Sequence, residues 1–312
     1  MDLLSVPSPS ALLLALFVVG YLVLAGADVG LGMLMPHVAR SPEQRRRVVA
    51  SIAPYFLASE VWLVAAVGVM AGMFPELEHL VVARLWPVLV VLLAGWLLRD
   101  AGLWFRARVD TPRWRGLCDT AIVAGSWTLA VSWGLAVAGL LSGGLSPSPF
   151  PVLCTITVVC LFALRGAAFG AERLVGPFEA ESADVAARAT RSLARFALGA
   201  TIATVLAAPW SGGPSPTSLG VAVTLAVVLA AALALTSGLT GPMFSRHTSA
   251  LAIAVPGLLV ASTAGLPASG LPGTTAVFVW SMLLPVVPVM LLGQVWLYRM
   301  TRRPAKGATF FA

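Results

Sequence analysis

The sequence predicts an all-α, polytopic membrane protein of about nine transmembrane helices, and three observations predict this class. The chain of 312 residues is 59% hydrophobic and only 11% charged, whereas a soluble domain carries about 25% charged residues. Its apolar residues form long runs with few or no charges, and a membrane helix needs about 20 such residues. Between the runs lie short segments that hold arginines or clusters of glycine and proline.

The first three spans follow from intervals that hold few charges. Residues 3–27 contain none, and the residues before them lack the positive charge of a secretory signal, so we expect a true span. Residues 48–75 enclose one charge, Glu60, and predict a second helix. Residues 85–103 predict a third helix.

Three longer intervals each predict a helical hairpin, which brings the total to nine helices. They hold no Asp, Glu, Lys or Arg, and each is interrupted once by residues that are typical of turns. The interruptions read SGGLSPSPFP, PWSGGPSPT and GLPASGLPGTT. We expect a single transmembrane domain over 1–312, with a first four-helix bundle at 1–142, a second at 150–267 and a final helix at 273–299.

Lysine and arginine residues gather at one side of the predicted membrane. Seventeen of the 20 lie after the first, third, fifth and seventh helices or in the C-terminal tail. Arg99 and Arg165 fall within helices, and only Arg84 lies on the other side. The positive-inside rule therefore predicts an N-terminus outside and a cytoplasmic C-terminus. These scattered residues do not form the basic face that nucleic-acid binding requires, so no nucleic-acid partner is expected.

Two acids inside the predicted helices are candidates for a proton path. A charge at the centre of a membrane helix costs about 2.5–3.5 kcal/mol, so ionisable residues there are functional candidates. Asp28 lies late in the first helix, and Glu60 lies near the middle of the second with no charged residue one turn away. The structural alternative is that Asp28 pairs with Arg99 or Arg165 and that Glu60 bonds a partner subunit.

Four further charged residues lie near the expected cytoplasmic ends of helices. We expect them to form buried ion pairs or to reach the membrane surface with their long side chains. They are Arg99, Asp100, Asp119 and Arg165.

The helices carry no residue pattern that predicts a reaction centre. The only histidines, His37, His79 and His247, each lie in or beside a predicted loop. Haem iron needs axial His, Met or Cys ligands, and the nine methionines and three cysteines are most simply packing residues. No HxxxH, CxxC, Walker loop or GxSxG occurs. We expect no catalytic residue, metal site or cofactor in this chain.

Small residues near the end of the first span predict close helix packing. Gly26 and Gly30 form a GxxxG pattern, with Gly32 nearby. Glycines allow two helix backbones to approach each other directly.

Several sequence blocks occur in an order that one membrane-protein family shares. They are GYLVLAGADVGLGML at 20–34, RRRVVASIAP at 45–54, EVWLVAAVGVMAGMFP at 60–75, LLRDAGLWFRARVDTPRWRGLCD at 97–119 and GSWTLAVSWGLAVAGLLSG at 125–143. A weaker block is ALRGAAFGAERLVG at 163–176. In these blocks the chain resembles subunit II of cytochrome bd-type quinol oxidases.

The resemblance implies a haem-free subunit II of a quinol:oxygen oxidoreductase in the inner or plasma membrane of a bacterial cell. Such a subunit supports assembly of subunit I, which carries haem b and haem d, oxidises quinol and reduces oxygen. In some members subunit II also lines a proton path from the cytoplasm. The implied partners are subunit I and membrane lipid, with quinone and small single-helix accessory subunits as further candidates.

The chain departs from the family pattern at two acids. Leu57 stands where the family has an acidic residue before EVWL, and Ala25 stands where it often has the first acid of Asp-Gly-Phe-Asp. Two alternatives remain open. Charges near the membrane midplane also suit a secondary transporter for a small solute, and a purely structural assembly protein would have no proton role.

Overall fold

The computed structural model confirms the all-α prediction. It describes residues 8–175, 180–211, 213, 218–238, 242–267 and 273–301. Over these residues the chain forms nine helices and no strand. The helices are α1 Pro9–Val38, α2 Pro42–Met73, α3 Pro75–Phe105, α4 Pro112–Ser142, α5 Pro149–Arg173, α6 Glu181–Ala207, α7 Leu219–Gly238, α8 Pro242–Thr263 and α9 Gly273–Met300.

Helix starts follow local sequence signals. Each of α1 to α5 begins at a proline, whose fixed φ suits the first helical position and whose missing N–H leaves no donor unpaired there. Ser41 caps α2 in a reciprocal arrangement with Gln44, in which each side chain accepts from the other's backbone N–H. The predicted turn after α4 is confirmed, because Gly143 adopts a left-handed φ of 76°.

Some boundaries differ from the sequence prediction. Only Phe74 separates α2 from α3, so the segment before residue 85 is helical and not a loop. The charged segment after residue 180 is likewise the start of α6. The second and third predicted hinges fall partly on residues 212, 214–217 and 268–272, which lie outside the described residues.

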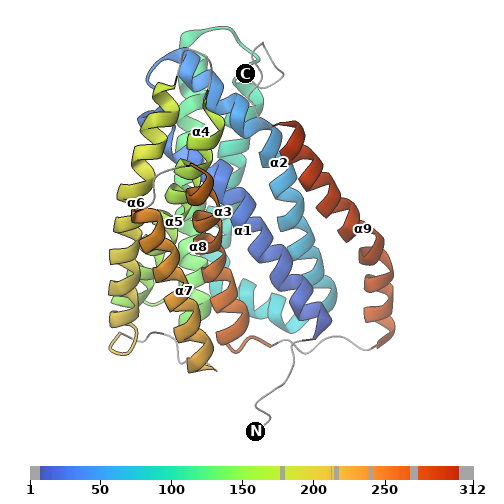
Figure 1. Cartoon of the computed structure of the whole chain (residues 1–312). Coiled ribbons are helices and arrows are strands. Elements are labelled where there is room, and N and C mark those ends of the chain that lie inside the picture. The colour runs from blue at the N-terminus through green and yellow to red at the C-terminus, as the bar shows by residue number, and fades with distance from the viewer. Residues whose placement is uncertain are drawn as a thin grey trace.

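Eight of the nine described helices are long and apolar enough to cross a membrane. The exception is α6, which carries five charged residues between its start and its middle: Glu181, Asp184, Arg188, Arg191 and Arg195. It is nevertheless 27 residues long, or about 40 Å at 1.5 Å per residue. Figure 1 shows it running beside α5 along the height of the bundle.

Helix α1 occupies the centre of the bundle. It packs against α2, α4, α5 and α8, whereas α9 packs mainly against α2 at the edge (Figure 1). The helices α1, α3, α5 and α9 end at the upper end of the bundle in that view. Because α1 touches helices of both expected four-helix bundles, the division at 1–142, 150–267 and 273–299 stays a prediction.

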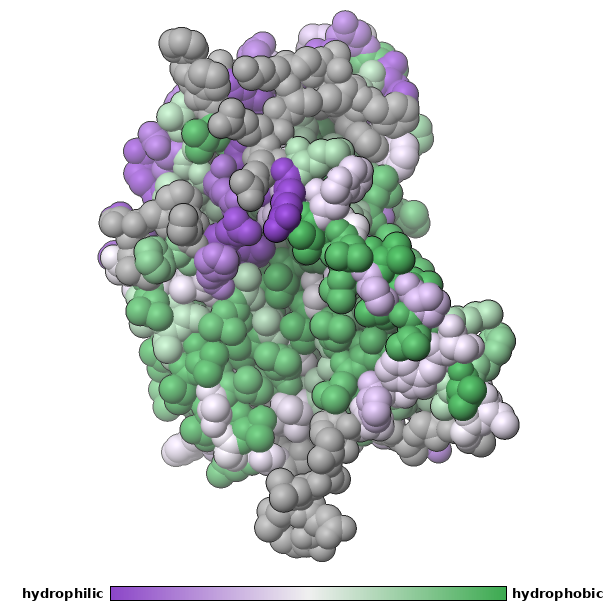
Figure 2. Space-filling view, turned by 45° about the vertical axis from the view of Figure 1, so that its right-hand side comes forward, coloured by the Kyte–Doolittle hydropathy of each residue, from purple (hydrophilic) through white to green (hydrophobic). Residues whose placement is uncertain are grey.

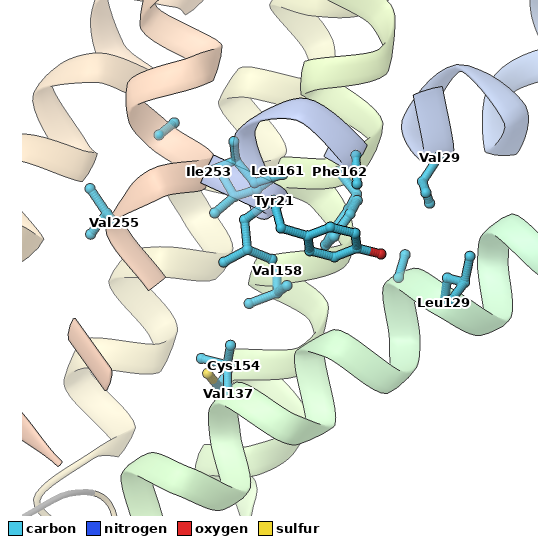
Figure 3. Packing of buried hydrophobic residues seen from close by; sticks show 14 of the residues in the cluster. Tyr21, Val29, Leu129, Val137, Cys154, Val158, Leu161, Phe162, Ile253 and Val255 are labelled. Atoms are coloured by element: carbon cyan, nitrogen blue, oxygen red, sulfur yellow. The ribbon is translucent and has the colours of Figure 1, made fainter. Parts of the chain in front are cut away.

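The core between α1, α4, α5 and α8 is apolar with one aromatic pair. Figure 3 shows Tyr21 of α1 pointing toward α4, with Val158 and Phe162 of α5 and Ile253 of α8 around it. The Tyr21 and Trp133 rings lie 5.2 Å apart between centroids. Burial of these side chains is the main stabilising contribution where helices meet.

The predicted close packing of α1 is confirmed at Gly30. A Cβ on Gly30 would meet the carbonyl of Phe162 and lie 2.7 Å from the amide nitrogen of Gly166, so the α1 and α5 backbones touch directly. Gly26 is also tight, since a Cβ there would lie 2.5 Å from Ile253 Cδ1 and 3.1 Å from Arg165 Cγ. Gly32 faces Ser126 in the same way.

Exposed apolar residues cover the sides of the bundle. Figure 2 shows a broad hydrophobic region over the middle and lower part of one face, with hydrophilic residues gathered toward the upper end. Residues of α9 contribute heavily to such surface, among them Val289 and Leu292. This distribution is the one that a bundle surrounded by lipid requires.

We predict that Gly30→Ala lowers the stability of the bundle. The added methyl group meets backbone atoms, which cannot rotate away, and overpacking of this kind costs about 1–3 kcal/mol or more. The thermal unfolding midpoint in mild detergent should fall. Gly68→Ala in α2 is the matched control, because a Cβ there meets nothing within 4 Å. Equal midpoints for the two variants would contradict the prediction.

Candidate functional site

Arg99 of α3 is the centre of a buried charge cluster. The residue is 2% exposed, although it lies only two turns before the end of its helix. Its Nη2 atom lies 3.2 Å from Asp28 Oδ2 of α1, and its Nη1 atom lies 3.8 Å from Glu60 Oε1 of α2 and 3.3 Å from Asp100 Oδ1. The guanidinium also lies over the Phe56 ring, 5.8 Å from its centroid. One cation thus connects three helices.

Asp28 is the deepest acid of the cluster, and it is fully buried. Its Oδ1 accepts from the Val29 backbone N–H at 2.6 Å, and its Oδ2 accepts from the Ser59 hydroxyl at 3.0 Å. These two hydrogen bonds and the ion pair with Arg99 stabilise a carboxylate that has no access to solvent. Of the two arginines considered for Asp28 from sequence, the structure pairs it with Arg99.

Glu60 lies at the edge of the same cluster. Its side chain is 15% exposed, and its Oε1 accepts from the Trp96 indole N–H at 2.8 Å. Asp100 is similarly half-buried beside it. Asp28 and Glu60 therefore both contact the guanidinium of Arg99. Their positions along the helices had suggested that Glu60 lies deeper in the membrane than Asp28.

Leu57 does not lie between these acids. It is 45% exposed on the outer face of α2, in line with exposed Val61 and Val64. Residues at this spacing share one side of a helix. Leu57 therefore faces outward, while Glu60 turns inward toward Trp96 and Arg99.

The cluster holds more acids than bases. Three carboxylates contact the one guanidinium of Arg99. Two negative charges would therefore remain uncompensated if all three acids were ionised, at a high cost in a low-dielectric interior. An arrangement of this kind can hold and release protons.

A second ion pair forms nearer the upper end of the bundle. Asp119 of α4 accepts from Arg106 Nε at 2.6 Å, and Arg45 Nη1 of α2 lies 3.7 Å from its other oxygen. The sequence singled out Asp119 but assigned Arg106 to a loop. Arg106 is in fact buried at the end of α3. Because Arg106 follows Gly102 by four residues, it lies on the side of α3 that packs against α4.

Arg165 of α5 forms hydrogen bonds with uncharged groups, whereas the sequence suggested a buried ion pair. It donates to the Val23 carbonyl at 3.2 Å, to the Arg246 carbonyl at 2.9 Å and to the Ser249 hydroxyl at 3.5 Å. Within the described part of the chain, the acceptors of these bonds are neutral. Arg173 at the end of α5 is also buried, which the sequence did not indicate.

The three histidines lie at helix ends. His37 is in the last turn of α1, His79 is in the first turns of α3, and His247 is in the first turns of α8, all exposed. Over the residues that the structure describes, no group of three or more His, Cys, Asp or Glu side chains is arranged to hold a metal ion.

Fold and site together define a polytopic α-helical membrane protein with an acidic cluster around one buried arginine. Residues 7–301 match the model of the family cytochrome bd terminal oxidase subunit II. The chain belongs to this family. It is a multi-pass protein of the bacterial inner membrane.

Known relatives resemble the chain over part of its length. It is 31% identical over 131 residues to a probable cytochrome oxidase subunit 2 of Haemophilus influenzae. It is 30% identical over 132 residues to the cytochrome bd-I ubiquinol oxidase subunit 2 of Escherichia coli K12. Each alignment covers 42% of this chain and 35% of the relative. The chain thus matches about a third of the length of these curated relatives.

A solved structure extends the likeness to the whole fold. The chain matches a chain of the bd oxidase from Geobacillus thermodenitrificans with a TM-score of 0.59. The match covers 94% of this chain and 97% of that one, at 11% sequence identity. At this identity the likeness concerns the fold alone.

We predict that Arg99→Gln destabilises the protein by about 3–5 kcal/mol, because breaking a buried ion pair leaves uncompensated charge. The measurement is the thermal unfolding midpoint in mild detergent. The double variant Asp28→Asn/Arg99→Gln removes the stranded carboxylate as well and should recover part of the loss. A double variant no more stable than Arg99→Gln would argue against the pairing.

Proposed function

We propose that this chain is the haem-free subunit II of a membrane complex that oxidises quinol and reduces oxygen to water. In this complex it supports assembly of subunit I, which carries haem b and haem d. Family membership over residues 7–301 is the observation that carries the proposal. The likeness to a bd oxidase chain over nearly the whole fold supports it. The comparisons give no support to the transporter alternative.

The proposed orientation has the N-terminus outside and the C-terminus in the cytoplasm. The arginines at the junctions α1–α2 and α3–α4 and those at the end of α5 and in α6 support it, since such residues concentrate on the cytoplasmic side. The upper end of the bundle in Figure 1 is then the cytoplasmic end. The Arg99 cluster lies in the half of the membrane nearer to that side.

We further propose that the Arg99 cluster takes part in proton uptake from the cytoplasm. Its three acids outnumber its one cation, and Glu60 and Asp100 reach the edge of the bundle while Asp28 is buried. A guanidinium stays protonated, so Arg99 itself passes no proton. Arg99 holds both carboxylates in place. Proton transfer between Glu60 and Asp28 therefore requires a water molecule beside the guanidinium.

Partners follow from the same proposal. Subunit I, membrane lipid and quinone are the expected ones, with small single-helix subunits as further candidates. The exposed apolar face of α2 and α3, with Val64, Trp86 and Leu97, offers a surface for a membrane partner.

We predict that the chain co-purifies from native membranes in mild detergent with a haem-bearing membrane subunit. The chain expressed alone should show no stoichiometric haem band in a reduced-minus-oxidised spectrum, because its helices offer no axial histidine deep in the bundle. A haem band in the single chain, or full recovery of a stable chain without a partner, would contradict the proposal.

We predict that Glu60→Gln slows quinol oxidation while haem content stays normal. The amide keeps the shape and the bond to Trp96 but cannot exchange a proton. Turnover should fall by about tenfold or more, since a positioned proton donor or acceptor contributes about 10²–10⁴-fold. Glu43→Gln at the exposed start of α2 is the control and should leave turnover unchanged. Normal turnover of an assembled Glu60→Gln complex would end the relay proposal.

A further inference from the structure

A polar cavity lies between α1, α5, α8 and α9, and Arg99 and its carboxylates are not part of its lining. Its volume is about 500 Å³. The side chains that give it its character are Arg165, Glu172, Arg173, Arg246, Tyr298 and Arg299. Its lining includes residues close to the last turns of α5 and α9, and these helices end at the upper end of the bundle in Figure 1.

The lining of this cavity is strongly basic. Four arginines and one glutamate line it. Among the described lining residues, the positive charges therefore exceed the carboxylates by three. Glu172 Oε1 lies 3.1 Å from Arg246 Nη1 and 3.9 Å from Arg173 Nη2. A single acid is thus shared by two of the four cations. This balance is the reverse of the one around Arg99.

Arg173 is the fixed part of this site. It is 2% exposed, its Nη1 donates to the Thr301 carbonyl at 3.0 Å, and its guanidinium lies 4.8 Å from the Tyr298 ring centroid. Its Nε and Nη2 atoms are buried with no hydrogen-bond partner among the described residues. Buried donors of a charged group are costly when unpaired. Among the described residues these two donors therefore lack an acceptor, and an anion would supply it.

One acceptor in the cavity lacks a donor as well. Glu172 Oε2 is buried with no hydrogen-bond partner in the described residues. A ligand that carries both an anionic group and a hydroxyl group would satisfy Arg173 and Glu172 together. A bare anion would satisfy only the arginine.

The surroundings of the cavity are apolar on the membrane side. Leu24, Ala250 and Val295 supply the apolar part of its lining, which His247 and Gln294 complete. The exposed side of α9 continues with Leu292 and Val289. Figure 2 shows hydrophilic residues above an extended hydrophobic region on this side of the molecule. A ligand with a polar head group and long apolar chains fits a polar cavity that lies beside an apolar helix surface.

We propose that this cavity binds the phosphate group of an anionic phospholipid that carries a head-group hydroxyl. Arg173 and Arg246 donate to the phosphate oxygens, a geometry that guanidinium groups favour. Glu172 accepts from the hydroxyl, and the acyl chains lie along α9. The bound lipid links α9 to α5 and α8. This site is separate from the proton path proposed above.

The test is lipid binding to the complex purified in mild detergent, stripped of lipid by detergent exchange and titrated in native mass spectrometry. Phosphatidylglycerol should bind at one site per chain, and zwitterionic phosphatidylcholine should bind at least tenfold more weakly. Arg246→Gln should weaken phosphatidylglycerol binding roughly tenfold or more, since a hydrogen bond to a charged group contributes about 1.5–3 kcal/mol. Arg299→Gln, which leaves the Glu172 pair intact, should weaken it in the same direction.

The matched control is Arg188→Gln, which removes an exposed arginine of α6 outside the cavity and should leave binding unchanged. Excess inorganic phosphate distinguishes the source of the anion. Retention of phosphatidylglycerol supports the lipid site, whereas displacement identifies a site for phosphate itself and would overturn the lipid assignment. Equal binding of the two lipids, or equal loss in Arg246→Gln and Arg188→Gln, would overturn the proposal.

Discussion

The contact of the α1 and α5 backbones at Gly30 and Gly166 determines where the charged residues of this bundle lie. No side chain separates the helices there, so α1 is held at the centre of the molecule. Asp28, two residues before Gly30, is thereby enclosed and meets α3. Arg165, next to Gly166, is turned into α1 and bonds the Val23 carbonyl. One close helix crossing thus places a residue of each polar site.

The two polar sites have opposite excess charge, and this explains what each requires from outside the chain. Around Arg99 three carboxylates share one guanidinium, so the excess is negative and protons reduce its cost. The cavity between α1, α5, α8 and α9 is lined by four arginines and one carboxylate, so the excess is positive and an anion reduces its cost. In water such imbalances would be screened, but in a bundle surrounded by lipid the low dielectric makes them strong. Within the described residues, each site therefore carries an excess charge that its own side chains do not compensate.

Leu57 has little influence on the acidic cluster, because it lies on the outer face of α2 and not between Asp28 and Glu60. The inner face keeps Glu60, which Trp96 fixes by a hydrogen bond, and Asp100 beside Arg99. Acidic character at this level of the bundle is thus retained on α2 and α3. The outer face on which Leu57 lies is apolar, as a surface in contact with lipid or another membrane helix must be.

The sequence by itself predicted the all-α class, a count of nine helices that holds over the described residues, and the acids within the spans. These features depend on local composition, because charges stand out in apolar runs. Only the tertiary structure decided that Arg99 pairs with Asp28, and that Arg106 and Arg173, which the sequence assigns to loops, are buried. Such pairs join residues far apart in the chain, and they depend on how each helix is rotated and how closely two helices approach. Local sequence patterns do not encode that geometry, since it results from the packing of all the helices together.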